Sequence, residues 1–224
     1  MERRLAAILL TDIVGYSRLM GLDEERIIAH QKAHRDDVID PTITQQGGRI
    51  VKSTGDGLLV EFPSVVDAVK CAVEVQSKLA DRDADVPEDR RIKYRIGINL
   101  GDVVVAGDDI LGDGVNVAAR LETIAQPGGV CLSDIAHDQI QNRVAAKFID
   151  GGHRQLKNIG RPIRVWHWSP AIGQHAGRFQ DIVNEAHEDL RPPSKPSLAV
   201  MPFRNLSPDA DQDFFADGIT DDII

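Results

Sequence analysis

The sequence is poor in cysteine, with only Cys71 and Cys131 among its 224 residues. Both lie in apolar segments, and their separation does not match the spacing of metal-ligating cysteines. This scarcity argues against a disulfide framework of the kind that secreted domains use. We therefore expect two buried thiols in a protein of a reducing, cytoplasmic compartment.

Long hydrophobic runs and an excess of basic residues are also lacking. No apolar run approaches the roughly 20 residues that span a bilayer, and the short apolar segment at residues 5–13 is better explained by a strand than by a signal peptide. Acidic residues outnumber basic ones by 35 to 26, which gives a formal charge of −9. The lack of a long apolar run argues against a membrane segment, and the acidic charge argues against a nucleic-acid partner.

One stretch, residues 48–62, organises the rest. Two largely apolar runs flank Ser53-Thr54-Gly55-Asp56-Gly57, which predicts a β-hairpin with one carboxylate at its tip. A Gly-Asp-Gly turn alone is weak evidence, and a second one occurs at residues 112–114. Asp12, at the end of the first apolar run, strengthens the interpretation of Asp56 as a functional residue. Two strand-end carboxylates in one small sheet could hold a hard cation between them.

The order of the predicted elements indicates an α+β fold. Residues 5–13 predict a buried strand, and Asp23 would cap a helix that Pro41 should kink or end. After the hairpin we expect a helix with Pro63 at its first position, an alternating strand over residues 92–100, and a further strand over 103–106 after a turn at Gly101-Asp102. The resulting β-α-β-β-α-β order is the ferredoxin-like plan, an α/β sandwich.

His30 and His34 lie one helical turn apart, a spacing that can bind a metal. We expect no third ligand near them, and neighbours such as Lys32 and Arg35 are charged. The pair is therefore interpreted as part of a solvated helix face.

The second half adds elements to the core. A helix over residues 115–125 would carry Asn116, Arg120 and Thr123 on one side, which suits a polar ligand as well as it suits an ordinary outer face. A short strand at 130–133, a helix at 134–142 and terminal strands at 147–149 and 163–168 follow. We expect a catalytic domain over residues 1–169, a proline-containing linker over 170–196 and the start of another domain over 197–224.

Three segments resemble, in order and spacing, the class III nucleotide cyclase catalytic domain. They are Thr11-Asp12-Ile13-Val14-Gly15, the segment from Lys52 to Gly57 that includes Asp56, and the segment from Asp109 to Glu122 that includes Asn116 and Arg120. The resemblance covers roughly residues 4–168 and implies the nucleotide cyclase fold with additional C-terminal strands and helices.

The resemblance also implies a mechanism, in which a head-to-tail homodimer shares its active sites across the interface. Asp12, Asp56 and the backbone carbonyl of Ile13 would bind two Mg²⁺ or Mn²⁺ ions, which promote in-line attack of the ribose 3′-hydroxyl on the α-phosphate. Arg120 would stabilise the transition state, and Asn116 would orient the ribose. These two residues would come from the partner subunit.

Base choice and phosphate binding follow from further matching positions. Lys52 and Asp109 match the adenine-selecting pair, which makes ATP the expected substrate and 3′,5′-cyclic AMP and pyrophosphate the expected products. Lys157 matches a triphosphate-binding lysine. Independently of the resemblance, the turn at Gly15 and Tyr16 would offer successive backbone N–H groups to a phosphate, or would be an ordinary strand-to-helix turn.

Two other interpretations remain open at this stage. A degenerate cyclase that only senses nucleotide would be expected to lack a metal aspartate or the arginine, and a structural dimerisation module would not need the Lys52/Asp109 pair. A diguanylate cyclase would share the core plan but would carry a different hairpin motif, which Gly55-Asp56-Gly57 does not match.

Overall fold

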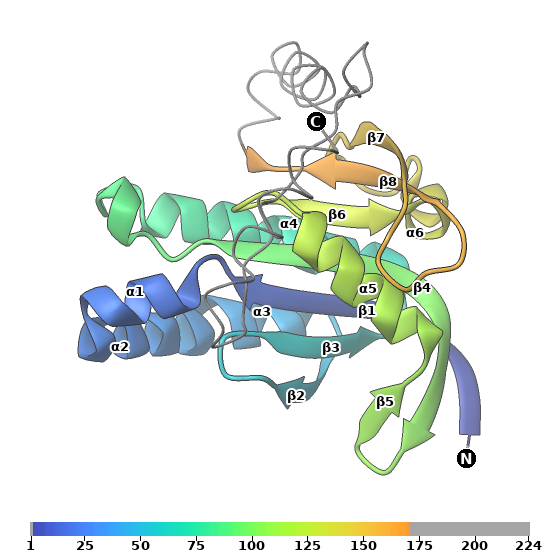
Figure 1. Cartoon of the computed structure of the whole chain (residues 1–224), viewed down its shortest axis with the longest axis horizontal. Helices are drawn as coiled ribbons and strands as arrows, with labels where there is room; N and C mark the ends of the chain where they lie inside the picture. Colours follow the sequence, from blue (N-terminus) through green and yellow to red (C-terminus); the bar gives the residue numbers. More distant parts are fainter. Residues whose placement is uncertain (1, 171–224) are drawn as a thin grey trace, which may run out of the picture. The chain divides into compact units, whose positions relative to one another are not determined.

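The computed structural model describes residues 2–170, which form an eight-stranded sheet with helices on both faces (Figure 1). The strands are β1 (Glu2–Ile13), β2 (Arg49–Ser53), β3 (Leu58–Phe62), β4 (Tyr94–Ala106), β5 (Asp109–Leu111), β6 (Val130–Ser133), β7 (Ile149–Arg154) and β8 (Ile163–Trp168). The helices are α1 (Tyr16–Leu22), α2 (Glu24–His34), α3 (Asp40–Gln45), α4 (Val65–Arg82), α5 (Asp113–Ile124) and α6 (Asp134–Ile140), with a π-helical turn at Arg35–Ile39 and a 3₁₀ turn at Glu88–Arg90.

The sheet contains the predicted ferredoxin-like core. Its strand order is β2-β3-β1-β4-β6-β8-β7, and β5 pairs with the end of β4. β1 lies between β3 and β4 and is antiparallel to both, while β6 runs parallel to β4. The expected α+β fold with additional C-terminal strands and helices is therefore confirmed.

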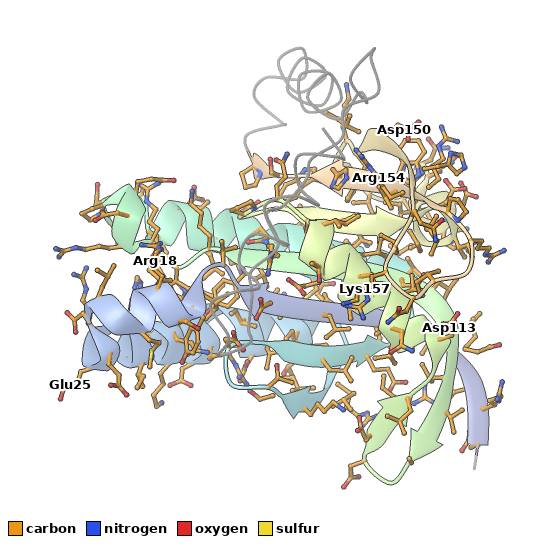
Figure 2. The ribbon with its side chains drawn as sticks, viewed as in Figure 1. Arg18, Glu25, Asp113, Asp150, Arg154 and Lys157 are labelled. Atoms are coloured by element: carbon orange, nitrogen blue, oxygen red, sulfur yellow. The ribbon has the colours of Figure 1, made fainter. Side chains whose placement is uncertain are left out.

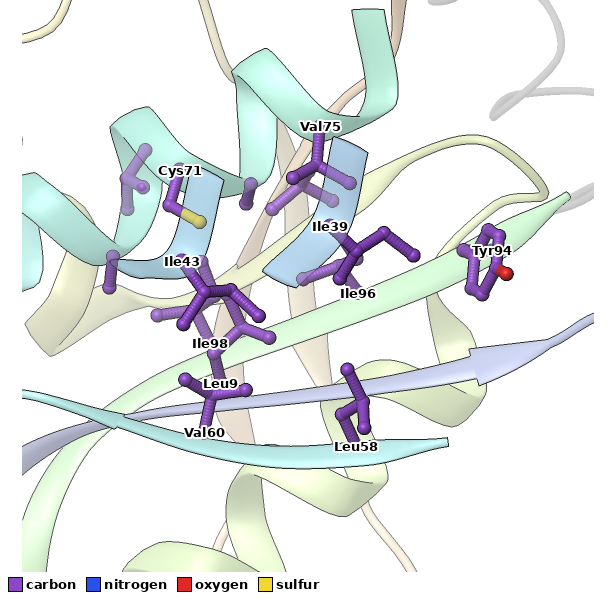
Figure 3. Close-up of a cluster of buried hydrophobic side chains, with 14 of the residues drawn as sticks. Leu9, Ile39, Ile43, Leu58, Val60, Cys71, Val75, Tyr94, Ile96 and Ile98 are labelled. Atoms are coloured by element: carbon purple, nitrogen blue, oxygen red, sulfur yellow. The ribbon is translucent and has the colours of Figure 1, made fainter. Parts of the chain in front are cut away.

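The middle of β1, from Ala6 to Leu9, is apolar and buried because helices cover both faces of the sheet there. Leu9 belongs to the core between the sheet and α3 and α4, which Figure 3 shows with Val60, Ile98 and Ile43. Its neighbour Ile8 points the other way, into a smaller cluster that includes Val103, Ile110 and Ala118.

β4 is one continuous strand of 13 residues, so the turn predicted at Gly101-Asp102 was wrong. Gly101 pairs with Ala6 of β1 inside the ladder. A Cβ atom at Gly101 would lie 2.9 Å from the Cα atom of Gly114 in α5. The glycine therefore permits close packing of a helix on the sheet and does not mark a turn.

The sequence predicted that Pro41 would kink or end the helix, and the helix does not end there. α2 stops at His34, a π-helical turn follows, and Pro41 lies in the first turn of α3. Asp40, the residue before Pro41, donates its N–H to the Arg35 carbonyl across the π-helical turn, and Pro41 itself has no N–H to donate. The predicted cap at Asp23 is confirmed, since its side chain accepts from the Arg26 N–H at 3.2 Å.

Two smaller expectations also differ from the structure. Pro63 precedes α4, whose N-cap is Ser64. The strand expected at 147–149 starts at Ile149 and runs to Arg154. The predicted linker over 170–196 lies outside the described residues except for its first residue, and the segment 197–224 lies wholly outside them.

Both cysteines are buried and free, as expected. Burial raises the pKa of the Cys71 thiol to about 12, so it stays protonated and unreactive. Within residues 2–170, no helix combines the length and apolarity that a membrane crossing requires.

Candidate active site

Asp12 and Asp56 are brought together by strand pairing. Asp12 lies next to the end of β1, and Asp56 lies in the tip between β2 and β3. Thr11 of β1 pairs with Leu58 of β3, which sets the two carboxylates side by side. Burial, followed by the negative charge of Asp12, raises the pKa of Asp56.

The tip requires glycine next to Asp56. A Cβ atom at Gly57 would lie 2.3 Å from the backbone oxygen of Thr11, closer than any side chain permits. Gly55 has a φ of +90°, a conformation that glycine adopts at little cost. The two glycines therefore press the hairpin tip against the end of β1.

The donor set at this edge fits a divalent cation. The two negative carboxylates repel each other, and a bound cation would remove this repulsion. Carboxylate and carbonyl oxygens are the ligands that Mg²⁺ and Mn²⁺ prefer. The backbone carbonyl of Ile13, the last residue of β1, adds a third oxygen donor at the same edge.

Arg95 is a site residue that the sequence analysis missed. It lies opposite Asp12 in the β1–β4 register, and its Nη2 donates to Asp12 Oδ2 at 2.9 Å. Its Nε lies 3.0 Å from Glu122 Oε1 of α5, without the alignment of a hydrogen bond. Burial raises the pKa of Glu122 to about 6. Arg95 thus links the carboxylate pair to α5, and only the strand register could have revealed this.

A second contact holds the hairpin tip from α2. Gln31 Nε2 donates to the Gly55 carbonyl at 2.8 Å, and the Tyr16 hydroxyl donates to Gln31 Oε1 at 3.3 Å. Gly15, with a φ of +65°, starts α1 at the predicted turn. The Tyr16 side chain therefore supports the tip that carries Asp56, while phosphate binding at this turn stays a prediction.

Lys52 and Asp109 form an ion pair, although 56 residues separate them in the sequence. Lys52 Nζ lies 2.7 Å from Asp109 Oδ2, and both side chains are exposed. Lys52 belongs to β2, and Asp109 is the first residue of β5. β5 pairs with the end of the long strand β4 and lies near the β2–β3 hairpin (Figure 1). The hydrogen bond from Lys52 lowers the pKa of Asp109.

α5 carries Asn116 and Arg120 on its outer side. Arg120 Nε donates to the Lys157 carbonyl at 3.2 Å, which ties the loop between β7 and β8 to the helix. Figure 2 shows Lys157 over α5. The helical spacing placed Asn116 and Arg120 on one side of a helix, and only the family resemblance singled out Lys157. The structure brings Lys157 to this helix.

The candidate residues thus form three groups within one chain: Asp12 with Asp56, Lys52 with Asp109, and Asn116 and Arg120 with Lys157. In the part of the chain that the structure describes, no hydrogen bond or ion pair joins one group directly to another. Each group is assembled locally by strand pairing or by helix packing.

His30 and His34 do not form a solvated face. His34 is fully buried, and its Nε2 lies 3.1 Å from Asp83 Oδ1, the atom that also lies 3.0 Å from His30 Nε2. Asp83 is the third potential ligand that the sequence analysis did not find. It follows α4, about 50 residues away in the sequence, so local spacing could not have identified it.

Comparisons with known proteins agree with this geometry. Residues 3–167 match the family model described as the adenylate and guanylate cyclase catalytic domain. The chain is 49% identical over 224 residues to "Putative adenylate cyclase 3" of Rhizobium meliloti (strain 1021), covering all of this chain and 38% of that protein. It is 30% identical over 146 residues to an adenylate cyclase of Streptomyces coelicolor, covering 65% of this chain and 36% of that protein.

Solved structures show the same fold. The adenylate/guanylate cyclase/hydrolase from Silicibacter pomeroyi is 53% identical with a TM-score of 0.72, over 75% of this chain and 98% of that chain. The guanylyl cyclase Cya2 is 26% identical with a TM-score of 0.64, over 75% and 92% of the two chains. This protein chain belongs to the adenylate and guanylate cyclase catalytic domain family, the class III nucleotide cyclases.

Proposed function

We propose that the chain is an adenylate cyclase that converts ATP into 3′,5′-cyclic AMP and pyrophosphate. The observation that carries this proposal is the Lys52–Asp109 pair, held at 2.7 Å in the same chain as the Asp12/Asp56 pair. Relatives named adenylate cyclase support it. Because the chain spans only 38% of the first of these relatives, the activity of any larger protein is part of the proposal.

In the proposed mechanism the carboxylates of Asp12 and Asp56, with the Ile13 carbonyl, hold two Mg²⁺ or Mn²⁺ ions. Bound there, the ions would lower the pKa of the ribose 3′-hydroxyl and neutralise triphosphate charge. The Arg120 guanidinium meets the negative charge that develops on the phosphoryl oxygens, and Asn116 orients the ribose. Lys157 and the turn at Gly15 and Tyr16 bind the triphosphate.

The proposed site takes residues from two chains. Among the described residues of one chain, no hydrogen bond or ion pair joins the carboxylate pair to Asn116 or Arg120. A two-fold homodimer would place these groups of opposite chains face to face and would form two equivalent sites. The Lys52–Asp109 pair would then lie beside the Asn116 and Arg120 of its own chain.

Adenine selectivity follows from hydrogen-bond matching. Lys52 can donate to adenine N1, and Asp109 can accept from the exocyclic amine. Guanine would set its N1–H against the ammonium group and its O6 against the carboxylate. Buried polar groups left unpaired cost roughly 1–3 kcal/mol each, so two mismatches give on the order of hundredfold discrimination or more.

The test is kcat/KM for ATP and for GTP with the wild type and with a Lys52→Glu/Asp109→Cys double variant. The wild type is expected to prefer ATP on the order of hundredfold, and the double variant should lose most of that preference. Lys78→Glu, which breaks an exposed ion pair with Glu74 on α4, is the matched control and should keep it. Equal use of both nucleotides by the wild type, or an unchanged ratio in the double variant, would overturn the assignment.

The domain boundaries and the location stay proposals. We propose a catalytic domain at 1–169, a linker at 170–196 and the start of a further domain at 197–224, in a cytoplasmic protein. These rest on the composition of the sequence and on its two buried thiols.

A further inference from the structure

A second cluster of ligand-type side chains lies outside the candidate active site. His30 and His34 project from successive turns of α2, and Asp83 caps the C-terminus of α4. One potential ligand atom from each residue lies within 4.8 Å of the other two. The cluster therefore joins two helices that are far apart in the sequence.

The cluster buries a carboxylate without a matching positive side chain. The Asp83 side chain is 4% exposed, and its only side-chain partners within residues 2–170 are the two histidines. The nearby Arg82 and Arg91 are paired with Asp37 and Glu88. A buried carboxylate that lacks a compensating charge costs free energy, and a bound cation would offset that cost.

Protonated histidine is a poor source of that cation. The His34 side chain is fully buried, so a positive charge on its imidazole ring would cost desolvation free energy. Asp83 Oδ2 and His34 Nδ1 are both buried and have no hydrogen-bond partner among the described residues. The cluster is therefore rich in lone pairs and poor in positive charge.

We propose that His30, His34 and Asp83 bind a divalent transition-metal ion, with Zn²⁺ as the best match. Two imidazole nitrogens and one carboxylate oxygen are a donor set that Zn²⁺ takes, with a water as the fourth ligand. Tetrahedral coordination at 2.0–2.2 Å separates ligand atoms by about 3.3–3.5 Å, so the 3.0 and 3.1 Å contacts need to widen only slightly.

Two features of the cluster bear on its access to an ion. The His30 side chain is 19% exposed, and Asp83 lines a cavity of about 270 Å³. An ion bound here would staple α2 to the end of α4. This site uses none of the residues assigned to the cyclase reaction, so it stands apart from the proposed function.

The test is a Co²⁺ titration of the purified full chain, followed by visible absorption and by displacement with Zn²⁺. Tetrahedral cobalt with nitrogen ligands absorbs far more strongly than an octahedral oxygen site, which distinguishes this cluster from Asp12 and Asp56. The wild type is expected to bind one equivalent with strong bands. His30→Gln, at a partly exposed position, should weaken binding at least ~10-fold. His153→Gln, at an exposed histidine, should leave it unchanged.

Circular dichroism checks that each variant is folded, and Asp83→Asn provides a second variant in case His30→Gln is not. Zn²⁺ should also raise the unfolding temperature of the wild type and not that of His30→Gln. The proposal is overturned by a wild type without strong cobalt bands, by full binding in a folded His30→Gln variant, or by loss of the bands in Asp56→Asn.

Discussion

Asp56 separates function from stability at the residue scale. Asp56→Ala should abolish cyclisation, because one of two carboxylate anchors for the metal ions is lost. The variant should remain folded, because the Asp56 side chain is not part of the hydrophobic core. The negative charge of Asp12 also repels it, so its removal relieves a repulsion. Activity and circular dichroism measured together check this.

Asp113→Ala is the matched control, because Asp113 lies in the second Gly-Asp-Gly segment. Its exposed carboxylate lies in the first turn of α5, where it contributes at most about 1 kcal/mol to helix stability. This variant should keep its activity. Near-normal turnover of a folded Asp56→Ala protein would instead refute the metal assignment.

His167 should make stability depend on pH. Burial, followed by the charge of Arg154, lowers the pKa of His167 from 6.5 to about 4. The folded state therefore binds fewer protons than the unfolded state between these values. The contribution of neutral His167 to the free energy of unfolding is therefore fully present above pH 6.5. It is lost as the pH falls towards 4, by at most about 3 kcal/mol.

Urea unfolding of the wild type and of His167→Gln at pH 7 and pH 4.5 measures this contribution. The loss of unfolding free energy on acidification should be smaller in the variant. If both proteins lose the same free energy, His167 is not the titrating group.

The residues that sequence predicted best are those with a local signal. Asp56 was placed at a hairpin tip by its glycines and its flanking apolar runs, and Asp12 by the end of a strand. Lys52 and Asp109 had no such signal, and only the family resemblance paired them. Arg95 and Asp83 were missed because strand register or helix packing creates their contacts.

At the scale of elements, α5 depends on a close approach to β4. A Cβ atom at Gly97 would lie 2.2 Å from the Glu122 nitrogen and 2.4 Å from the Ala118 oxygen, both backbone atoms of α5. Gly97→Ala should push the helix off the sheet and lower the free energy of unfolding by roughly 1–3 kcal/mol or more. Since α5 carries Asn116 and Arg120, activity should fall as well.

Gly21→Ala controls for the change of residue type, because no atom lies within 4 Å of the added Cβ atom. Gly21 lies in α1, so alanine there should leave stability unchanged or raise it by up to about 1 kcal/mol. Denaturant unfolding of both variants checks the pair. Equal stability of Gly97→Ala and wild type would show that α5 does not need this contact.

Element types were predicted better than element boundaries. The β-α-β-β-α-β order followed from periodicity, since strands alternate and helices repeat every 3.6 residues. β4 was divided at Gly101 because the turn signal of glycine is local, whereas the helix that packs on this glycine comes later in the chain. The π-helical turn before Pro41 was not predicted, because the helical spacing of the apolar residues does not mark it.

At the scale of the whole molecule, the proposed reaction depends on the pairing of two chains. The described residues contain every group that the proposed reaction needs, but in one chain no hydrogen bond or ion pair joins the carboxylate pair to Asn116 or Arg120. The sequence predicted this division only through the family resemblance, since no pattern within a chain reports how two copies pair. Association of two chains should also make specific activity rise with protein concentration.

Complementation tests the central claim most directly. Asp56→Ala and Arg120→Ala chains are each expected to be inactive, because every site in either homodimer lacks one group. Mixed in equal amounts with ATP and Mn²⁺, they should form cyclic AMP at about one quarter of the wild-type rate. This follows because half of the dimers are mixed and each mixed dimer has one intact site. No cyclic AMP from the mixture, with heterodimers confirmed by co-purification of differently tagged chains and with an active wild type, would contradict the shared active site.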